Sequence, residues 1–326
     1  MKKMQDKKEQ LMKIFSLRLR EILAKLPIDF EEVQEIRLRI NAPLLILYRN
    51  NEYYVTREGC LGVIQEEAVQ ITREEIRETI EFISNYSLYA YEEEIKQGFI
   101  TIQGGHRVGI AGKAVIDSQS AIKSMKYISF INVRVSHEVK GCADKLLPYV
   151  LEDNQVHQTL IISPPGCGKT TMLRDLVRQL SNGSDGTGGL TVGVVDERSE
   201  IGACYMGEPQ NDLGIRTDIL DCCPKAQGMM MLIRTMSPQV VAVDEIGSRE
   251  DLDAMYYVVN CGAKLIATVH GNSMEDIRTK PVLRQMVEQR LFERYVILDN
   301  NSAIGSIRNI FDGMGNLLYC RERLLG

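Results

Sequence analysis

The feature that most constrains this chain is a short apolar run followed by a glycine-rich turn and a helical pattern. Residues 160–162 are typical of a buried strand, residues 163–168 form a loop rich in proline and glycine, and Lys169 begins the helical pattern. A strand, a loop and a helix in this order are the setting of a phosphate-binding loop. The backbone amides of such a turn and of the helix N-terminus favour an anion at one point.

The residue types in this loop predict a site for ATP and Mg²⁺. We expect Lys169 to reach the β- and γ-phosphates, and the hydroxyl of Thr170 to be a ligand of Mg²⁺. The usual pattern begins with glycine, whereas this chain has Ser163, which is small but has less backbone freedom. The predicted nucleotide-binding residues are Ser163, Pro164, Pro165, Gly166, Cys167, Gly168, Lys169, Thr170 and Thr171.

Length and composition indicate a cytoplasmic globular protein of about two domains. The 326 residues are 44% hydrophobic and 25% charged, an ordinary balance for such a protein. The formal net charge of -5 provides no global basic field that would recruit nucleic acid. We find no apolar run long enough to span a bilayer and no signal-peptide pattern at the N-terminus. The eight cysteines contain no C-x-x-C pair, so we expect reduced thiols.

Apolar patterning divides the chain into an α+β domain at residues 1–140, a linker at 141–155 and a second domain at 156–326. The first domain has strand patterns at 33–40, 44–48, 53–56, 98–115 and 128–135, and a helix capped by Thr72 and Glu75. Residues 1–25 predict a basic amphipathic helix. Such a helix can touch an anionic membrane or an acidic partner, but packing on its own domain is the favoured interpretation.

The second domain alternates strands with helices, which predicts a parallel sheet covered on both faces. The expected strands are residues 160–163, 190–196, 240–244, 264–269 and 295–298, and the expected helices are 169–180, 225–236, 249–261 and 273–291. A hairpin at 306–311 and 317–321 closes the chain. Ligands of such sheets bind at the carboxyl ends of the strands, so we expect one shared site there.

Two acidic residues follow the apolar strand at 240–243, which is the Walker B form. We expect Asp244 to hold Mg²⁺ through a water molecule, and Glu245 to orient or deprotonate an attacking water. A hydrolase needs this second carboxylate, whereas a kinase does not.

Two further strand ends carry candidate residues. Asp196 and Glu197 follow another apolar strand, where they can bind a water, share the role of base with Glu245, or cap the local loop. His270 follows the strand after Walker B and is either a contact of the γ-phosphate or a structural histidine.

Four segments carry a resemblance to a known family when they are taken in order, namely SPPGCGKTT, VVDERSE, VVAVDEIG and LIATVHG. They resemble the Walker A, Asp box, Walker B and His box of secretion and pilus-motor ATPases, and in particular those that serve sporulation in endospore formers. The resemblance implies a RecA-like ATPase domain, a separate N-terminal domain and a homo-hexameric ring. It also implies a cytoplasmic protein, peripheral at the mother-cell membrane, that energises sporulation membrane channel proteins between mother cell and forespore.

The same resemblance implies that arginines of the N-terminal domain meet the nucleotide. Arg107 and Arg134 lie in the segments that match, and a guanidinium there would neutralise charge on the γ-phosphate. A location on the protein surface is the alternative for both. Further candidates at the subunit boundary are Arg198, Arg216 and Arg234. The acidic box and Ser163 depart from the pilus-motor pattern, which leaves the roles of Glu197 and Glu245 undivided.

Two other functions are compatible with these motifs. The first is a nucleic-acid-dependent ATPase with a RecA-like core, against which stand the net charge and the lack of a basic, aromatic stripe. The second is a scaffold that binds ATP without hydrolysing it, against which stand Lys169, Asp244 and Glu245.

Overall fold

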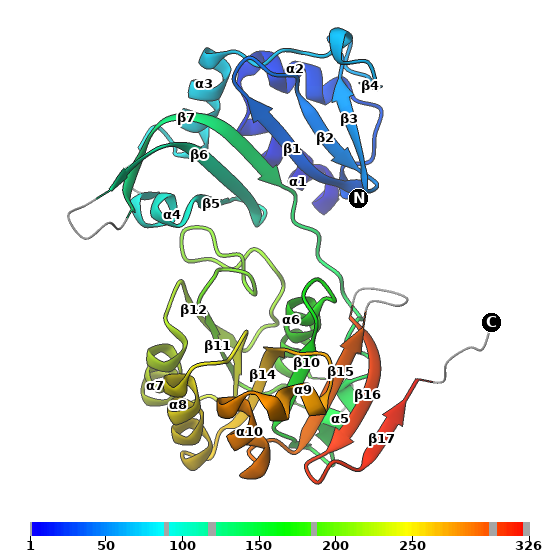
Figure 1. Ribbon diagram of the computed structural model, residues 1–326, viewed down its shortest axis with the longest axis vertical. Helices are drawn as coiled ribbons and strands as arrows, with labels where there is room; N and C mark the ends of the chain where they lie inside the picture. The colour runs from blue at the N-terminus through cyan, green and yellow to red at the C-terminus, as the bar shows by residue number, and fades with distance from the viewer. Residues whose placement is uncertain (1, 88–90, 117–121, 184–187, 300–304, 322–326) are drawn as a thin grey trace. The chain divides into compact units, whose positions relative to one another are not determined.

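The computed structural model describes residues 2–87, 91–116, 122–183, 188–299 and 305–321. Contacts divide the chain into two compact units, Met1–His137 and Glu138–Gly326 (Figure 1). Each unit has its own sheet and its own core, and each is described by itself below.

The N-terminal unit is an antiparallel sheet with helices. Its seven strands are arranged in the order β4-β3-β2-β1-β7-β6-β5. The helices are α1 (Lys2–Lys13), α2 (Leu17–Lys25), α3 (Arg73–Ile83) and α4 (Glu92–Gln97). The strands are β1 (Val33–Arg39), β2 (Leu45–Tyr48), β3 (Asn51–Val55), β4 (Leu61–Gly62), β5 (Phe99–Ile102), β6 (His106–Ile116) and β7 (Ile122–Arg134).

The basic N-terminal segment packs on its own unit. It forms two helices rather than the single helix that we expected, because the helix ends at Lys13 and a new one begins after Ser16. Leu11, Phe15 and Leu19 are buried in the same core as strand β1, which agrees with the favoured interpretation. The predicted capping box of α3 is confirmed, since the Thr72 side chain accepts from the Glu75 amide and the Glu75 side chain accepts from Thr72.

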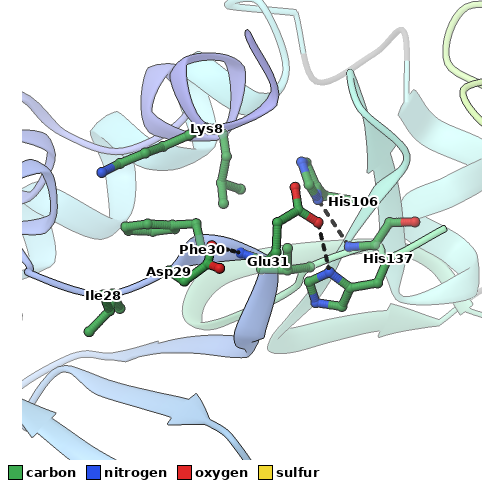
Figure 2. A pocket seen from close by; sticks show the side chains of 10 residues that line it. Lys8, Ile28, Asp29, Phe30, Glu31, His106 and His137 are labelled. Atoms are coloured by element: carbon green, nitrogen blue, oxygen red, sulfur yellow. Dashed lines mark hydrogen bonds and ion pairs between the residues drawn. The ribbon is translucent and has the colours of Figure 1, made fainter. Parts of the chain in front are cut away.

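A pocket of about 160 Å³ lies where the chain leaves the N-terminal unit. Figure 2 shows Glu31 pointing toward His137, whose Nδ1 lies 3.8 Å from the Glu31 carboxylate. His137 Nε2 donates to the Val33 carbonyl (2.7 Å), and His106 Nδ1 accepts from the Ser136 amide (3.0 Å). These two imidazoles fasten the residues after β7 to the start of β1 and to β6.

The C-terminal unit is built on an eight-stranded sheet in the order β12-β11-β13-β14-β10-β15-β16-β17. The strands are β10 (Thr159–Ser163), β11 (Val192–Asp196), β12 (Thr217–Asp221), β13 (Val240–Val243), β14 (Lys264–His270), β15 (Arg294–Asp299), β16 (Ser306–Asp312) and β17 (Leu317–Cys320). A separate small hairpin pairs β8 (Leu151–Glu152) with β9 (Gln155–Val156). The helices are α5 (Leu147–Val150), α6 (Lys169–Asn182), α7 (Lys225–Thr235), α8 (Arg249–Asn260), α9 (Met274–Thr279) and α10 (Pro281–Glu288).

Six neighbouring strands, from β12 to β15, are parallel, and β16 and β17 extend the sheet as an antiparallel hairpin. Alternate residues of each central strand point to opposite faces, as in β13, where Val241 and Val243 join one core and Val240 and Ala242 another. Helices α7 to α10 contribute to the first of these cores and α6 to the second (Figure 1). The parallel sheet covered on both faces is therefore confirmed.

The structure of this unit departs from the sequence-based expectations in two places. The helix expected over residues 273–291 is two helices, because Pro281 begins α10 and holds Lys280 in an extended conformation. Strand β12 was not predicted, because its residues are only half-buried or exposed and carry two aspartates.

Candidate functional site

The loop between β10 and α6 presents an uncapped helix start. Gly168 is the residue before the helix, its φ of 84° lies in the left-handed region that glycine adopts freely, and it supplies no side-chain cap. The backbone N–H groups of the first helical turn have no acceptor within the helix, so they can bind a ligand ahead of the helix N-terminus. Of the loop residues that we predicted, Ser163 and Cys167 are buried, whereas Pro165 and Gly166 are exposed. The Ser163 hydroxyl bonds the adjacent Pro164 carbonyl (2.6 Å), and the Thr171 carbonyl accepts from Cys142 Sγ (3.5 Å).

The first helical turn meets the end of strand β13. Thr170 Oγ1 donates to Asp244 Oδ2 at 2.6 Å, so the predicted pair of metal-binding residues is in direct contact. The other carboxylate oxygen, Oδ1, accepts from the hydroxyl of Thr268 on β14. Both oxygens of Asp244 are thus directed by hydroxyl groups from neighbouring elements.

Glu245 is held by three basic side chains. Its Oε1 lies 2.5 Å from Lys169 Nζ and 2.9 Å from His270 Nε2, and its Oε2 accepts from Arg198 at 2.7 Å. Burial alone would raise the pKa of this carboxyl. The bond to Lys169, together with the charges of Lys169, Arg198 and His270, holds the pKa below its ordinary value.

The backbone of Glu245 is also unusual. Its φ is 55°, in the left-handed region that a residue with a side chain rarely adopts. Its amide donates to Thr268 Oγ1 at 2.9 Å, and that hydroxyl donates in turn to Asp244. One threonine therefore fixes both acidic residues at the end of β13. Strained conformations of this kind gather at functional sites.

The second acidic pair, at the end of β11, lies in different surroundings. Asp196 is 2% exposed, and its carboxylate accepts from the amides of Glu200 (2.8 Å), Ile201 (2.9 Å) and Gly202 (2.8 Å). Burial raises the pKa of Asp196 to about 6, even though these amides oppose the shift. Glu197 forms an ion pair with Lys225. Of the interpretations left open for Asp196, the structure favours the capping of its own loop.

Both acidic pairs nevertheless line one small cavity of about 10 Å³, which has room for roughly one water molecule. Arg198, Glu200 and Lys225 complete this lining. The cavity brings Glu197 and Glu245 to the same place.

The arginines named from the sequence have separate locations. Arg198 bonds Glu245, whereas Arg216 donates to the Ser181 carbonyl at the end of α6 (3.1 Å). Arg234 lies over the ring of Tyr257, at 5.9 Å from its centroid.

Arg107 and Arg134, the two arginines that the resemblance placed near the nucleotide, are cross-strand partners on β6 and β7. Arg107 stacks on the Phe99 ring at 3.6 Å from its centroid, and Arg134 Nε lies 3.8 Å from Glu35. Contact of either arginine with a nucleotide stays a prediction.

Sequence reasoning missed two residues of this site. Thr268 lies two positions before His270 on the same strand, so the alternation of β14 places both on one face and offered a signal. Lys225 begins α7, a helix that the apolar pattern predicted, but nothing in the sequence connects its side chain with Glu197.

Comparison with known families assigns the chain to one of them. The profile of the family described as "Sporulation stage III, protein AA" matches residues 5–318. The chain belongs to this family. Stage III sporulation protein AA of Bacillus subtilis (strain 168) is 42% identical to it over 287 residues, which are 88% of this chain and 89% of the relative. The resemblance inferred from the four motifs is therefore confirmed.

Solved structures confirm the predicted fold class of this family member. The pilus retraction motor PilT with bound ADP superposes with a TM-score of 0.60 at 13% identity, over 97% of this chain and 84% of that one. The ATPase DotB of Legionella pneumophila gives a TM-score of 0.52 at 14% identity, over 86% of this chain and 74% of that one. At these identities the likeness shows a shared RecA-like fold. Within the described residues, no helix combines the length and apolar character that crossing a bilayer requires.

Proposed function

We propose that this member of the sporulation stage III protein AA family is a Mg²⁺-dependent ATP hydrolase. The observation that carries the proposal is the hydrogen bonding between the first turn of α6 and the end of β13. Lys169 and Thr170, adjacent on the first turn of α6, contact Glu245 and Asp244, adjacent at the end of β13. The side chains expected to hold phosphate and Mg²⁺ therefore lie within hydrogen-bond distance of the two carboxylates at the end of β13.

The residues present fit both the nucleotide and the metal. The uncapped start of α6 and the Lys169 ammonium suit the phosphates, and the Thr170 hydroxyl and Asp244 carboxylate are the oxygen ligands that Mg²⁺ prefers. When bound there, Mg²⁺ would neutralise charge on the phosphate oxygens. Thr268 keeps the Asp244 carboxylate oriented by donating to its second oxygen.

Glu245 is the best candidate for the group that activates water. A base must be ionised, and the lowered pKa of Glu245 keeps it a carboxylate at neutral pH. Its partner Lys169 has three N–H donors and can turn them toward phosphate oxygens, which would release Oε1 for a water molecule. His270 Nε2, at 2.9 Å, and Arg198 then remain to hold the carboxylate in position.

Family membership and the shared fold support the wider role that the sequence predicts. We infer a cytoplasmic homo-hexameric ring, peripheral at the mother-cell membrane, that energises a sporulation transport complex. The N-terminal unit would serve assembly and regulation, with Arg107 and Arg134 facing a nucleotide. This role is supported by the B. subtilis relative and by the likeness to PilT and DotB.

The test is ATP hydrolysis by the purified full chain, measured together with its oligomeric mass. We expect phosphate release that requires Mg²⁺ and stops on chelation, and a mass that increases when ATP and Mg²⁺ are added. A chain that binds ATP but releases no phosphate would instead be a nucleotide-gated scaffold. A chain that retains no adenine nucleotide with Mg²⁺ present would end the proposal.

A further inference from the structure

Strands β6 and β7 continue as a two-stranded arm beyond the rest of the N-terminal sheet (Figure 1). Strand β5 pairs with β6 only up to Gly109, and β1 pairs with β7 only from Phe130 onward. Within the described residues, 113–116 of β6 and 122–126 of β7 therefore pair only with each other. Together with the residues that join this ribbon to the sheet, they make up segments 111–116 and 122–129, which we call the β6–β7 arm. Two-stranded ribbons have little core of their own, so the exposed side chains of this arm need a separate explanation.

A bulge at the start of the arm is built into the sequence. Between the pairs Ala111–Phe130 and Lys113–Lys126 the register shifts, and Tyr127 has a φ of 49°. A side chain at Gly112 would lie 2.8 Å from the Ile128 Cα and from two carbonyl oxygens, so only glycine fits there. The bulge leaves the Tyr127 ring 73% exposed, while Ile128 packs partly against the core of the unit.

The charge of the arm is entirely positive among its described residues. Lys113, Lys123 and Lys126 are exposed, and residues 111–116 and 122–129 include no aspartate or glutamate. Lys113 and Lys126 are direct cross-strand partners, an arrangement in which like charges repel. No ion pair joins these lysines to any part of the chain that the structure describes. The arm therefore contrasts with a chain whose net charge is -5.

Apolar side chains accompany these lysines. Ile116 and Ile122 are another cross-strand pair and are 62% and 44% exposed, respectively. Exposed isoleucine and tyrosine beside lysine is the composition of protein segments that rest on lipid headgroups, because the rings and methyl groups enter the interface while the ammonium groups meet phosphates.

We propose that the β6–β7 arm binds the surface of an anionic lipid bilayer. Its lysines supply charge complementarity, and the anionic surface offsets the repulsion between Lys113 and Lys126. The exposed isoleucine pair favours a bilayer over nucleic acid, because phosphodiester backbones offer aliphatic side chains no apolar phase. The proposal concerns lipid alone and does not depend on ATP hydrolysis, since it is tested without nucleotide.

The chain has no tryptophan, so a single one placed on the arm is an unambiguous reporter. Tyr127→Trp is the reporter, and Tyr86→Trp is its matched control, because both tyrosines belong to the N-terminal unit and are 73% exposed. Vesicles of phosphatidylcholine and phosphatidylglycerol should shift the emission of Tyr127→Trp to shorter wavelength and leave that of Tyr86→Trp unchanged. Equal emission of Tyr127→Trp with and without these vesicles, or a shift produced by single-stranded DNA and not by vesicles, would overturn the proposal.

Charge removal tests the lysines directly in a vesicle co-sedimentation assay with the full chain. Each lysine near such a surface contributes roughly fivefold to partitioning, so Lys113→Gln, Lys123→Gln and Lys126→Gln together should weaken it roughly a hundredfold. The control combines Arg57→Gln, Arg73→Gln and Lys145→Gln, which remove three exposed positive charges elsewhere and should change partitioning only a few-fold. Urea unfolding checks that both triple variants are folded. Equal partitioning of the two folded variants would contradict the assignment to the arm.

Discussion

Strands β11 and β13 are parallel neighbours, and each has the sequence valine, aspartate, glutamate at its carboxyl end. At the end of β11, Asp196 accepts hydrogen bonds from three loop amides, and Glu197 forms an ion pair with Lys225. At the end of β13, Asp244 accepts hydrogen bonds from two hydroxyl groups. Glu245 there is bound by Lys169, Arg198 and His270. The same three residue types thus form a loop cap on one strand and a candidate metal and water site on the next. What distinguishes them is the neighbouring element, since β13 ends beside the first turn of α6.

The largest expected difference between the two strand ends concerns their lysines. Lys169→Ala removes the ammonium group that serves the phosphates, and we expect ATP affinity to fall about a hundredfold or more. Lys225→Ala removes the partner of Glu197 and should leave ATP affinity within about threefold, because the ion pair of Lys225 is with the carboxylate at the end of β11. Equilibrium titration with ATP and Mg²⁺ measures both. Equal losses of ATP affinity in the two variants would show that both strand ends belong to one nucleotide site.

The buried carboxyl of Asp196 makes the pH dependence of stability a second point of difference. Its pKa of about 6 in the folded protein exceeds the ordinary value of 3.8, so the protonated form is favoured by folding. The stability that it contributes is fully present below pH 3.8 and is lost as pH rises through about 6, a change on the order of 3 kcal/mol.

Asp196→Asn should remove this pH dependence. We expect the free energy of unfolding of the wild type, relative to the variant, to fall between pH 4 and pH 7.5 in urea titrations. A difference that stays constant over this range would show that Asp196 titrates normally.

Thr268 offers a smaller test of the β13 end. Thr268→Val keeps the shape of the side chain but leaves Asp244 Oδ1 and the Glu245 amide without their partner, and should cost about 1–2 kcal/mol of stability. Thr268→Ser retains the hydroxyl and is the matched control. If both variants unfold at the same denaturant concentration, the hydroxyl does not organise the two acidic residues.

The smallest expected effect belongs to Arg198. Arg198→Gln removes one of the positive charges that lower the pKa of Glu245, so that pKa should move upward. A base is lost when it is protonated, and the acidic limb of the rate profile should therefore move to higher pH. Because the Arg198 side chain is 62% exposed, its charge is screened, and the rate at pH 8 should change by less than about threefold. An unmoved acidic limb would mean that Arg198 does not influence the base.

The sequence predicted the fold and the residues that meet in the candidate site at the ends of β10, β13 and β14, because both rest on local patterns. The strand, loop and helix around Lys169 and the apolar runs before Asp244 and His270 specify a parallel sheet and place its carboxyl ends together. The break of the last long helix at Pro281 was also readable, because proline restricts the residue before it.

The division of roles between the two acidic pairs could not be predicted from the sequence. Asp196 and Asp244 each lie between a valine and a glutamate, and their difference arises from contacts with residues far along the chain or in an irregular loop. The edge strand β12 escaped notice for a related reason, since its half-buried and exposed residues lack the apolar run of a central strand. The surroundings of these residues are set by tertiary contacts, which the local sequence pattern does not contain.

The most direct test of the account is single-turnover hydrolysis of bound ATP by Glu245→Gln and Glu197→Gln, compared with the wild type under enzyme excess. If the end of β13 activates water, Glu245→Gln should retain ATP but hydrolyse it about a hundredfold or more slowly, whereas Glu197→Gln should stay within a few-fold of the wild type. Normal hydrolysis by Glu245→Gln, with a stalled Glu197→Gln, would transfer the water-activating role to the end of β11 and contradict the account.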